Sequence, residues 1–469
     1  MRGRIACWLV LGAGVLLSGC AGRRDYAPPA ALVPPVRALV RAEPAGEGAL
    51  VPSAQWWEAL NDPQLNGLIA QGLLNAPQVA VAQARLQQAR AGVLAARADG
   101  MPGLRPAAGM LHAQLPEGLG SATFYNLGFD AQWEADIWGG KRQQTRQRRA
   151  EAQVAQARVA DVQVMLAAEI ARSYVLMRGR ETVLDLLQKR AEAEQRMLTL
   201  AQARLAGGTG TAQGVQAVQA QIAATQGAQA AAMADIVTLR DGLAVLTGQA
   251  PGALDGLKPA VIPQAPPQVV TGAVGDILAR RPDIRAAERA YAAASAGVGV
   301  ALARRYPSVS VLGLVGLGGS SPEAMFDTSA GAAAVLPRLT WDFPNFGRVE
   351  AGVRAARGGQ EAALAQYRQA VLAALQDAEG AVTRFGAARA VASQSADQVS
   401  MAGKTMDLEL IRAEAGSTSQ LAAYEAVVRF LNARITAAGD RAQVSLAYVA
   451  LAKAMGLGWQ APLDQGAVR

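Results

Sequence analysis

The second half of the chain repeats the landmark residues of the first half. A segment bounded by Pro77 and Pro102 has a counterpart of equal length, bounded by Pro282 and Pro307, at a sequence offset of 205. Several landmarks in the same order at nearly one offset indicate an internal structural repeat, so each half is expected to contain the same elements. The later landmarks repeat at an offset of 208: Trp133-Glu134 with Trp341-Asp342, Trp138-Gly139 with Phe346-Gly347, Arg204 and Gly208 with Arg412 and Gly416, and Leu243-Ala244 and Gly248 with Leu451-Ala452 and Gly456.

The repeat suggests an organisation into six segments. Two of them, an arm and a linker, contain Pro-rich stretches, 27–52 and 249–275, which are expected to be extended because proline fixes φ and removes a backbone donor. The segments are a lipoprotein signal peptide (1–19), an N-terminal Pro-rich arm (20–62), a first structural repeat (63–248), a Pro-rich equatorial linker (249–281), a second structural repeat (282–456) and a C-terminal tail (457–469).

Two proline-free stretches, 140–205 and 347–415, predict very long helices. At 1.5 Å per residue each would reach roughly 100 Å. Each is expected to fold back through a Gly-containing turn into a second helix, over 212–247 and 420–455, and shorter helical spacing covers 63–99 and 282–304.

Helices this long and thin must pack laterally against neighbours, because they cannot enclose a globular core. The sequence shows one seam for such packing, in which apolar residues step by three and four as in a heptad repeat. Its members are Leu421, Tyr424, Val428, Leu431 and Ile435.

Between the short and the long helices of each half, the hydrophobic period changes from 3.6 to 2. Residues 125–135 place apolar side chains at odd positions and polar ones at even positions, which predicts a strand with one apolar face. Its expected partner covers about 105–115, and the second half repeats the hairpin over 308–317 and 333–343. Strands of about 10 residues with this pattern suit a membrane β-barrel, although a soluble sandwich gives the same alternation.

Four aromatic residues lie near the ends of these strands, where an aromatic girdle would meet the membrane interface. Two hairpins give four strands, whereas the smallest single-chain barrels have about eight, and open strand edges are not tolerated in lipid. The strands therefore span a membrane only if several copies share one barrel. The four aromatic residues are Trp133, Trp138, Trp341 and Phe346.

The N-terminus reads as a signal peptide. Arg2 and Arg4 precede an apolar run over 5–17, which is too short to span a bilayer. The following Leu17-Ser18-Gly19-Cys20 resembles a bacterial lipobox, which implies cleavage before Cys20 and lipid on that cysteine, and Ala21 implies sorting to the outer membrane. The alternative is an ordinary signal peptide with a chance cysteine.

Composition disfavours several classes of function. The chain has two cysteines, Cys7 and Cys20, and one histidine, His112, so Cys/His catalysis and zinc ligation are nearly excluded. The net charge of +8, or +6 after loss of Arg2 and Arg4, is dispersed along helical segments, which argues against nucleic-acid binding. Without a nucleophile elbow, metal cluster or phosphate loop, no enzyme activity is expected, and no cofactor other than the lipid on Cys20. His112 is expected to be structural or lumenal.

Five motifs, taken in order, carry a family resemblance that covers nearly all of the mature chain. With the internal duplication, they resemble the bacterial outer-membrane factor family, the TolC-like exit ducts of tripartite pumps, and its NodT-like lipoprotein branch. The motifs are Trp56-Trp57 with Asp62-Pro63-Gln64-Leu65, Asn75 with Pro77, Trp133-Glu134-Ala135-Asp136-Ile137-Trp138-Gly139-Gly140, Arg280-Arg281-Pro282-Asp283-Ile284-Arg285 with Ala287-Glu288, and Gly456-Leu457-Gly458-Trp459.

The resemblance implies a mainly α fold with a β membrane part. Three protomers would each give four β-strands to a shared 12-stranded outer-membrane β-barrel, and their long antiparallel coiled-coil helices would form a trimeric α-barrel across the periplasm. The implied function is that of an outer-membrane exit duct, which conducts solutes passively to the outside from a periplasmic adaptor and an inner-membrane transporter.

The same resemblance implies that adaptor hairpins dock at the two helix–turn–helix tips, at Gly207, Gly208 and Thr209 and at Gly416, Ser417 and Thr418. A plain helix C-cap is the alternative for either turn alone. It also implies a periplasmic gate with Glu425 and Arg412. Gly214 and Ala422 stand where related ducts carry acids, which puts a carboxylate gate in doubt, and Glu425 could equally be a solvated helix residue.

Two other functions remain open at this stage: a non-conducting structural coiled-coil lipoprotein and the duct of a type I protein secretion system. The alternation around Trp133 argues against the first. Scarce histidine and unclustered methionines disfavour a dedicated copper or silver path and leave drugs and small toxic organics as cargo.

Overall fold

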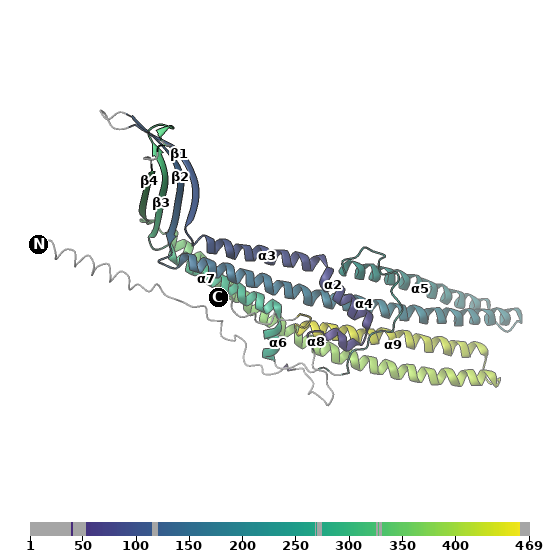
Figure 1. Ribbon diagram of the computed structural model, residues 1–469. Helices are drawn as coiled ribbons and strands as arrows, with labels where there is room; N and C mark the ends of the chain where they lie inside the picture. Colours follow the sequence, from purple (N-terminus) through teal and green to yellow (C-terminus); the bar gives the residue numbers. More distant parts are fainter. Residues whose placement is uncertain are drawn as a thin grey trace. The chain divides into compact units, whose positions relative to one another are not determined.

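The computed structural model describes residues 39–40, 53–114, 121–267, 269, 274–324, 327 and 331–459. The signal peptide, Cys20 and most of the Pro-rich arm lie outside the described residues. Within them, no helix is long and apolar enough to cross a bilayer. The elements follow in the order η1 (Trp56–Leu60), α2 (Pro63–Asn75), α3 (Pro77–Ala98), β1 (Gly103–Gln114), β2 (Ser121–Ala135), α4 (Gly140–Ala206), α5 (Ala212–Leu246), α6 (Val274–Arg280), α7 (Pro282–Ala303), β3 (Ser308–Gly319), β4 (Gly331–Thr340), α8 (Arg348–Glu414) and α9 (Gln420–Ala454) (Figure 1).

The hairpin and the two long helices expected in each half are confirmed, and their lengths match except in the second strand of the hairpin, which has 15 residues in β2 and 10 in β4. Helices α4 and α8 each have 67 residues, and α5 and α9 each have 35. Helices α3 and α7 each have 22 residues, and β1 and β3 each have 12. The equal lengths of these four pairs of elements mean that most of the duplicated landmarks stand at the same structural positions in both halves.

The chain forms two compact units that interleave in sequence. One unit contains Arg85–Ala155 and Ala286–Arg368, and therefore the whole four-stranded sheet. The other contains Val33–Ala84, Gln156–Arg285 and Gln369–Arg469, and therefore the helical turns at the ends of α4 and α8.

The sheet is antiparallel with the order β1-β2-β3-β4, and its outer strands are β1 and β4 (Figure 1). The two hairpins have the same register: Gly103 pairs with Gln132 in the first, and Ser308 pairs with Thr340 in the second. Strand β3 is thus the counterpart of β1 at a sequence offset of 205, and β4 is the counterpart of β2 at an offset of 208. The change of offset falls within the hairpin loop, so the second loop is longer than the first while the pairing stays intact.

Two predicted boundaries are wrong. The helical stretch over 63–99 is two helices, because Ala76 is extended before Pro77, as the residue before a proline usually is. Strand β4 ends at Thr340, so Trp341 and Phe343, expected within the strand, follow it in a turn that leads to Pro344.

The core of the second unit contains the first of the sequence motifs. Trp56 is 1% exposed and contacts the ring of Tyr448 edge to face, and the Tyr448 hydroxyl donates to the Trp56 carbonyl oxygen at 2.9 Å. Arg281 donates to the Ala454 carbonyl oxygen at 2.9 Å, and Trp459 donates to that of Arg280 at 3.2 Å. These motifs hold α9 and the ends of both repeats together.

The predicted seam on α9 is confirmed. Val428 and Leu431 are buried against α4, where Met197 and Leu186 lie in the same apolar clusters. Leu421, Tyr424 and Ile435 pack at the edge of these clusters.

Candidate functional site

The first candidate site is the sheet, whose two faces differ in chemistry. Side chains of paired residues on neighbouring strands point to the same face of the sheet. The register therefore assigns each side chain of the four strands to one of the two faces. Every Asp, Glu and Arg of the four strands falls on one face: Arg105, Asp130, Glu134 and Arg338.

The opposite face is apolar along most of its length, and it is continuous over the four strands. Large apolar side chains on this face are exposed: Phe129 is 48% exposed, Val315 is 55% exposed and Leu339 is 67% exposed. Polar groups enter it only at the loop end of the first hairpin, where His112 Nδ1 lies 2.9 Å from Thr123 Oγ1. His112 therefore lies on the apolar face rather than among the charged residues.

Trp133 and its counterpart in the second half, Trp341, are fixed by equivalent hydrogen bonds. The indole N–H of Trp133 donates to the Gly100 carbonyl oxygen at 3.2 Å, and that of Trp341 donates to the Arg305 carbonyl oxygen at 3.3 Å. Both acceptors lie in the turn between a short helix and a strand. The rings remain 39% and 55% exposed, so each presents an apolar surface at a strand end.

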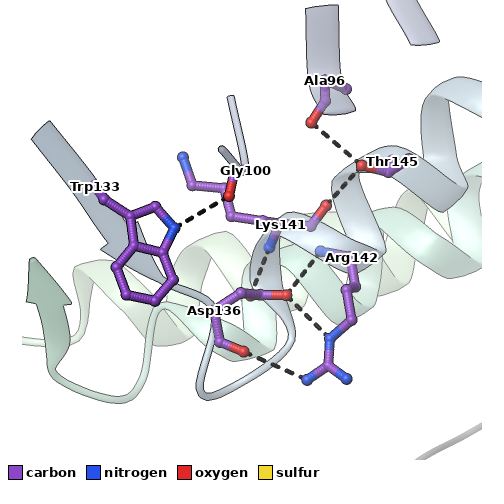
Figure 2. A network of polar contacts seen from close by, with 7 residues as sticks. All are labelled: Ala96, Gly100, Trp133, Asp136, Lys141, Arg142 and Thr145. Atoms are coloured by element: carbon purple, nitrogen blue, oxygen red, sulfur yellow. Dashed lines mark hydrogen bonds and ion pairs between the residues drawn. The ribbon is translucent and has the colours of Figure 1, made fainter. Parts of the chain in front are cut away.

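The junction between β2 and α4 is held by Asp136 (Figure 2). Its carboxylate accepts the backbone N–H groups of Lys141 and Arg142 at 2.9 and 3.0 Å, and the Arg142 side chain at 3.1 Å. A carboxylate on the first amides of a helix satisfies donors that lack intrahelical partners and complements the helix dipole. Thr145 ties α4 to the Ala96 carbonyl oxygen of α3 at 3.3 Å.

The other two predicted interface aromatics differ from each other. Trp138 stacks on Tyr306 with ring centroids 4.6 Å apart, and its indole donates to the Pro307 carbonyl oxygen at 2.7 Å. Phe346 has a φ of 46° and is 95% exposed. The two halves therefore differ in the short segment between the sheet and the long helix, and they match again along α4 and α8.

The second candidate site is the pair of helical turns in the other unit. Gly208 and Gly416 have φ values of 73° and 74°, in the left-handed region that glycine adopts without strain. In the first turn, Gly208 donates to the Leu205 carbonyl oxygen at 3.1 Å and Thr209 donates to that of Arg204 at 2.9 Å. Together these bonds form a Schellman motif.

The second turn repeats this pattern. Gly416 donates to the Ala413 carbonyl oxygen at 3.2 Å, and Ser417 donates to that of Arg412 at 2.9 Å. Gly207, Gly208 and Thr209 are exposed, as are Gly416 and Ser417, whereas Thr418 is half-buried. The structure thus gives both turns one backbone shape and an accessible surface.

Sequence reasoning missed the residues that begin the return helices. Thr211 Oγ1 accepts the N–H of Gly214, and Ser419 Oγ accepts that of Ala422, both at 3.1 Å. The signal was present, because Ser and Thr are preferred directly before a helix.

The family model described as outer membrane efflux protein matches residues 68–249 and 273–457. The chain belongs to the outer membrane efflux protein family. Multidrug resistance outer membrane protein MdtP of Escherichia coli (strain K12) is 27% identical over 478 residues, which cover 98% of this chain and 97% of MdtP. Pyoverdine export outer membrane protein OpmQ of Pseudomonas aeruginosa is 27% identical, over 87% of this chain and 88% of OpmQ.

Solved structures agree with this membership. The outer-membrane channel OprN matches this efflux-family protein with a TM-score of 0.86 at 29% identity, covering 94% of this chain and 100% of that chain. The outer membrane protein VceC from Vibrio cholerae matches with a TM-score of 0.77 at 25% identity, covering 87% of this chain and 100% of that chain.

The two residues predicted for a gate are exposed in this efflux-family chain. Arg412 Nη1 donates to Glu409 Oε1 of its own helix at 3.1 Å, and Glu425 lies 4.0 Å from Arg429 on the next helical turn. A different arginine crosses between helices near the second turn: Arg196 of α4 donates to the Tyr424 hydroxyl of α9 at 3.1 Å. This hydrogen bond raises the pKa of Arg196, whose charge is already permanent at neutral pH.

Proposed function

We propose that this protein is the outer-membrane exit duct of a tripartite efflux system. It conducts solutes passively, while a periplasmic adaptor links it to an inner-membrane transporter that supplies the energy. Family membership supports this assignment, and the relatives MdtP and OpmQ carry names that refer to multidrug resistance and pyoverdine export.

One structural observation carries the proposal: an apolar sheet face that is continuous over four strands and has an unpaired strand at each edge. Such a face is stable against lipid tails, but an open edge is not, because its backbone groups would lack partners. Three copies that pool their sheets into a 12-stranded barrel satisfy both conditions and enclose a channel.

The long helices supply the rest of the duct. Lateral packing of the helical hairpins from three copies would continue the channel into the periplasm as an α-barrel. The matched turns after α4 and α8 would then present six equivalent surfaces to the adaptor, two from each copy. Cys20 would carry the lipid that anchors each copy to the outer membrane.

Conductance in planar lipid bilayers tests this function directly. The purified protein should sediment in mild detergent as a trimer and should open stable ion-conducting pores. A trimer that never conducts would favour the structural lipoprotein instead, and a monomer that is soluble without detergent would contradict both the shared barrel and the duct. Labelling with radioactive palmitate, present in the wild type and absent from Cys20→Ala, tests the anchor separately.

A further inference from the structure

A hollow of about 760 Å³ lies between α4, α7 and α8, within the unit that contains the sheet. Hollows of this volume accommodate ligands of drug size. Neither the strands nor the two helical turns contribute to its lining, so it is distinct from both candidate sites. We call it the arginine pocket, after the four arginines that line it: Arg146, Arg149, Arg289 and Arg357.

Helix α7 contacts both long helices and forms the floor of the arginine pocket. It packs on α4 through a buried cluster of Ala150, Ala292 and Ala293. On its other side, Gln360 of α8 donates a hydrogen bond to the Tyr291 hydroxyl at 3.5 Å. The space between the two long helices stays open because most of the floor residues of α7 are small, among them Ala292, Ser295, Ala296 and Gly299.

The lining of the arginine pocket carries an excess of positive charge. Its described residues include four arginines and a single carboxylate, that of Glu361. Arg289 is engaged, because its Nε donates to Glu288 at 2.8 Å. Arg149 and Arg357 differ from it, since neither forms an ion pair or a side-chain hydrogen bond with any residue in the part of the chain that the structure describes. Two exposed guanidinium groups therefore keep their donors available to a ligand.

The internal repeat explains how these two arginines come to share one pocket. Arg149 of α4 and Arg357 of α8 are related by the sequence offset of 208, so they occupy the same position in two equivalent helices. Arg146 adds a third cation to the lining, three residues before Arg149 and on the same helix face. Like charges gathered in this way repel one another, and a bound anion would offset that repulsion.

We propose that the arginine pocket binds a soluble organic anion, with an apolar body of drug size and carboxylate, sulfonate or phosphate groups. Guanidinium groups bind such oxygens through paired N–H donors, and the uncharged floor on α7 suits the apolar body. The inference goes beyond the proposed function, because one chain supplies every residue of the lining and binding requires no open pore.

Calorimetric titration of the full-length protein with naphthalene-1,5-disulfonate tests the proposal. This rigid aromatic dianion is soluble in water, and a neutral maltoside detergent supplies no competing anion. We expect one dianion to bind per chain, and no binding of paraquat, an aromatic dication of similar size. Inorganic sulfate, which lacks the apolar body, should bind at least tenfold more weakly. Raising NaCl from about 50 to about 500 mM should weaken the binding of the dianion several-fold, because salt screens charges that are open to solvent.

Two double variants separate the arginine pocket from the overall charge of the protein. Arg149→Gln with Arg357→Gln should weaken binding of the dianion at least tenfold, because both unpaired guanidinium groups are lost. The matched control is Arg90→Gln with Arg97→Gln, at two exposed arginines of α3 outside the lining, and it should bind like the wild type. Both variants change the net charge equally, and circular dichroism checks that both are folded.

Equal weakening in the two double variants would overturn the site, since binding would then follow net charge alone. Equal affinities for sulfate and the dianion would overturn the organic ligand. Displacement of the dianion by phosphatidylglycerol added to the micelles would assign the pocket to lipid headgroups instead. A wild type that conducts but does not bind the dianion would overturn the inference and leave the duct in place, whereas one that binds it without conducting would support the inference and contradict the duct.

Discussion

Tyr174 donates a hydrogen bond of 2.8 Å to Oδ2 of Asp62, a residue 112 positions earlier in the chain. The other oxygen of the same carboxylate accepts the N–H groups of Gln64 and Leu65 at 2.9 and 3.1 Å. One aspartate therefore caps the start of α2 and ties it to the middle of α4. The Asp-Pro-Gln-Leu motif thus has a structural role in the second unit.

Removing this carboxylate should destabilise the helical unit. Asp62→Ala loses an N-cap, worth about 1 kcal/mol, and leaves the buried Tyr174 hydroxyl without its acceptor, worth about 1–3 kcal/mol. Guanidinium unfolding in detergent, followed by circular dichroism, should show a lower midpoint. Asp397→Ala, at an exposed position of α8, is the matched control and should unfold like the wild type. Equal midpoints for the two variants would contradict the role of Asp62.

The buried hydroxyl of Tyr448 should make the free energy of unfolding fall at alkaline pH. Burial raises the pKa of its hydroxyl to about 12, whereas an unfolded tyrosine titrates near about 10. Below pH 10 both states keep the proton. As the pH rises from 10 to 12 the unfolded state ionises first, so the free energy of unfolding should fall, by up to about 3 kcal/mol at 1.36 kcal/mol per pH unit.

Tyr448→Phe isolates this contribution. The variant loses the hydrogen bond to the Trp56 carbonyl oxygen, which costs about 1 kcal/mol at neutral pH, and it should lose less stability than the wild type between pH 9 and pH 11. Chemical unfolding at both pH values measures the difference. Parallel pH dependence in the two proteins would show that Tyr448 does not contribute.

The elements that could be predicted are those whose signal is local. The period-2 pattern in 125–135 and the proline-free stretch from Gly140 depend on neighbouring residues, and both elements formed as expected. The turns at Gly208 and Gly416 were also readable, because only glycine takes a left-handed φ freely.

The features that were missed depend on tertiary contacts. The hydrogen bond between Asp62 and Tyr174 joins positions 112 residues apart, and no local pattern links them. Phe343 continues the alternation of β4 in sequence, but the strand ends at Thr340 because the chain turns toward Pro344 and α8. The sequence suggested a gate at Arg412 and Glu425, and their partners in a single chain lie on their own helices.

Adjacent residues of β3 offer a sharp test of which sheet face meets lipid. Val315 lies on the apolar face and Leu314 lies on the opposite face, where it pairs with Asp130. Lysine at the lipid-facing midplane of a barrel costs about 2–4 kcal/mol. Val315→Lys should therefore reduce the yield of folded trimer in outer membranes, measured by resistance to dissociation in cold SDS. Leu314→Lys should be tolerated, since its ammonium group would lie beside Asp130, and a reversed order would mean that the faces are assigned the wrong way round.

The two helical turns, at Gly208 and Gly416, should be the surface that binds the adaptor. Valine strongly disfavours the left-handed φ of 73–74° found at Gly208 and Gly416, so Gly208→Val with Gly416→Val should distort both Schellman turns without touching the sheet. Because the turns would be the docking surface, co-purification with a tagged adaptor and drug resistance in cells should both fall at least tenfold, while pore conductance in bilayers stays unchanged. The control is Gly227→Val, at an exposed glycine in the middle of α5 where an added Cβ would meet no atom within 4 Å, and where valine and glycine differ little in helix propensity. Normal adaptor binding by the double variant would place docking elsewhere on the helices, and a loss of conductance would show that the turns support the duct itself rather than the adaptor.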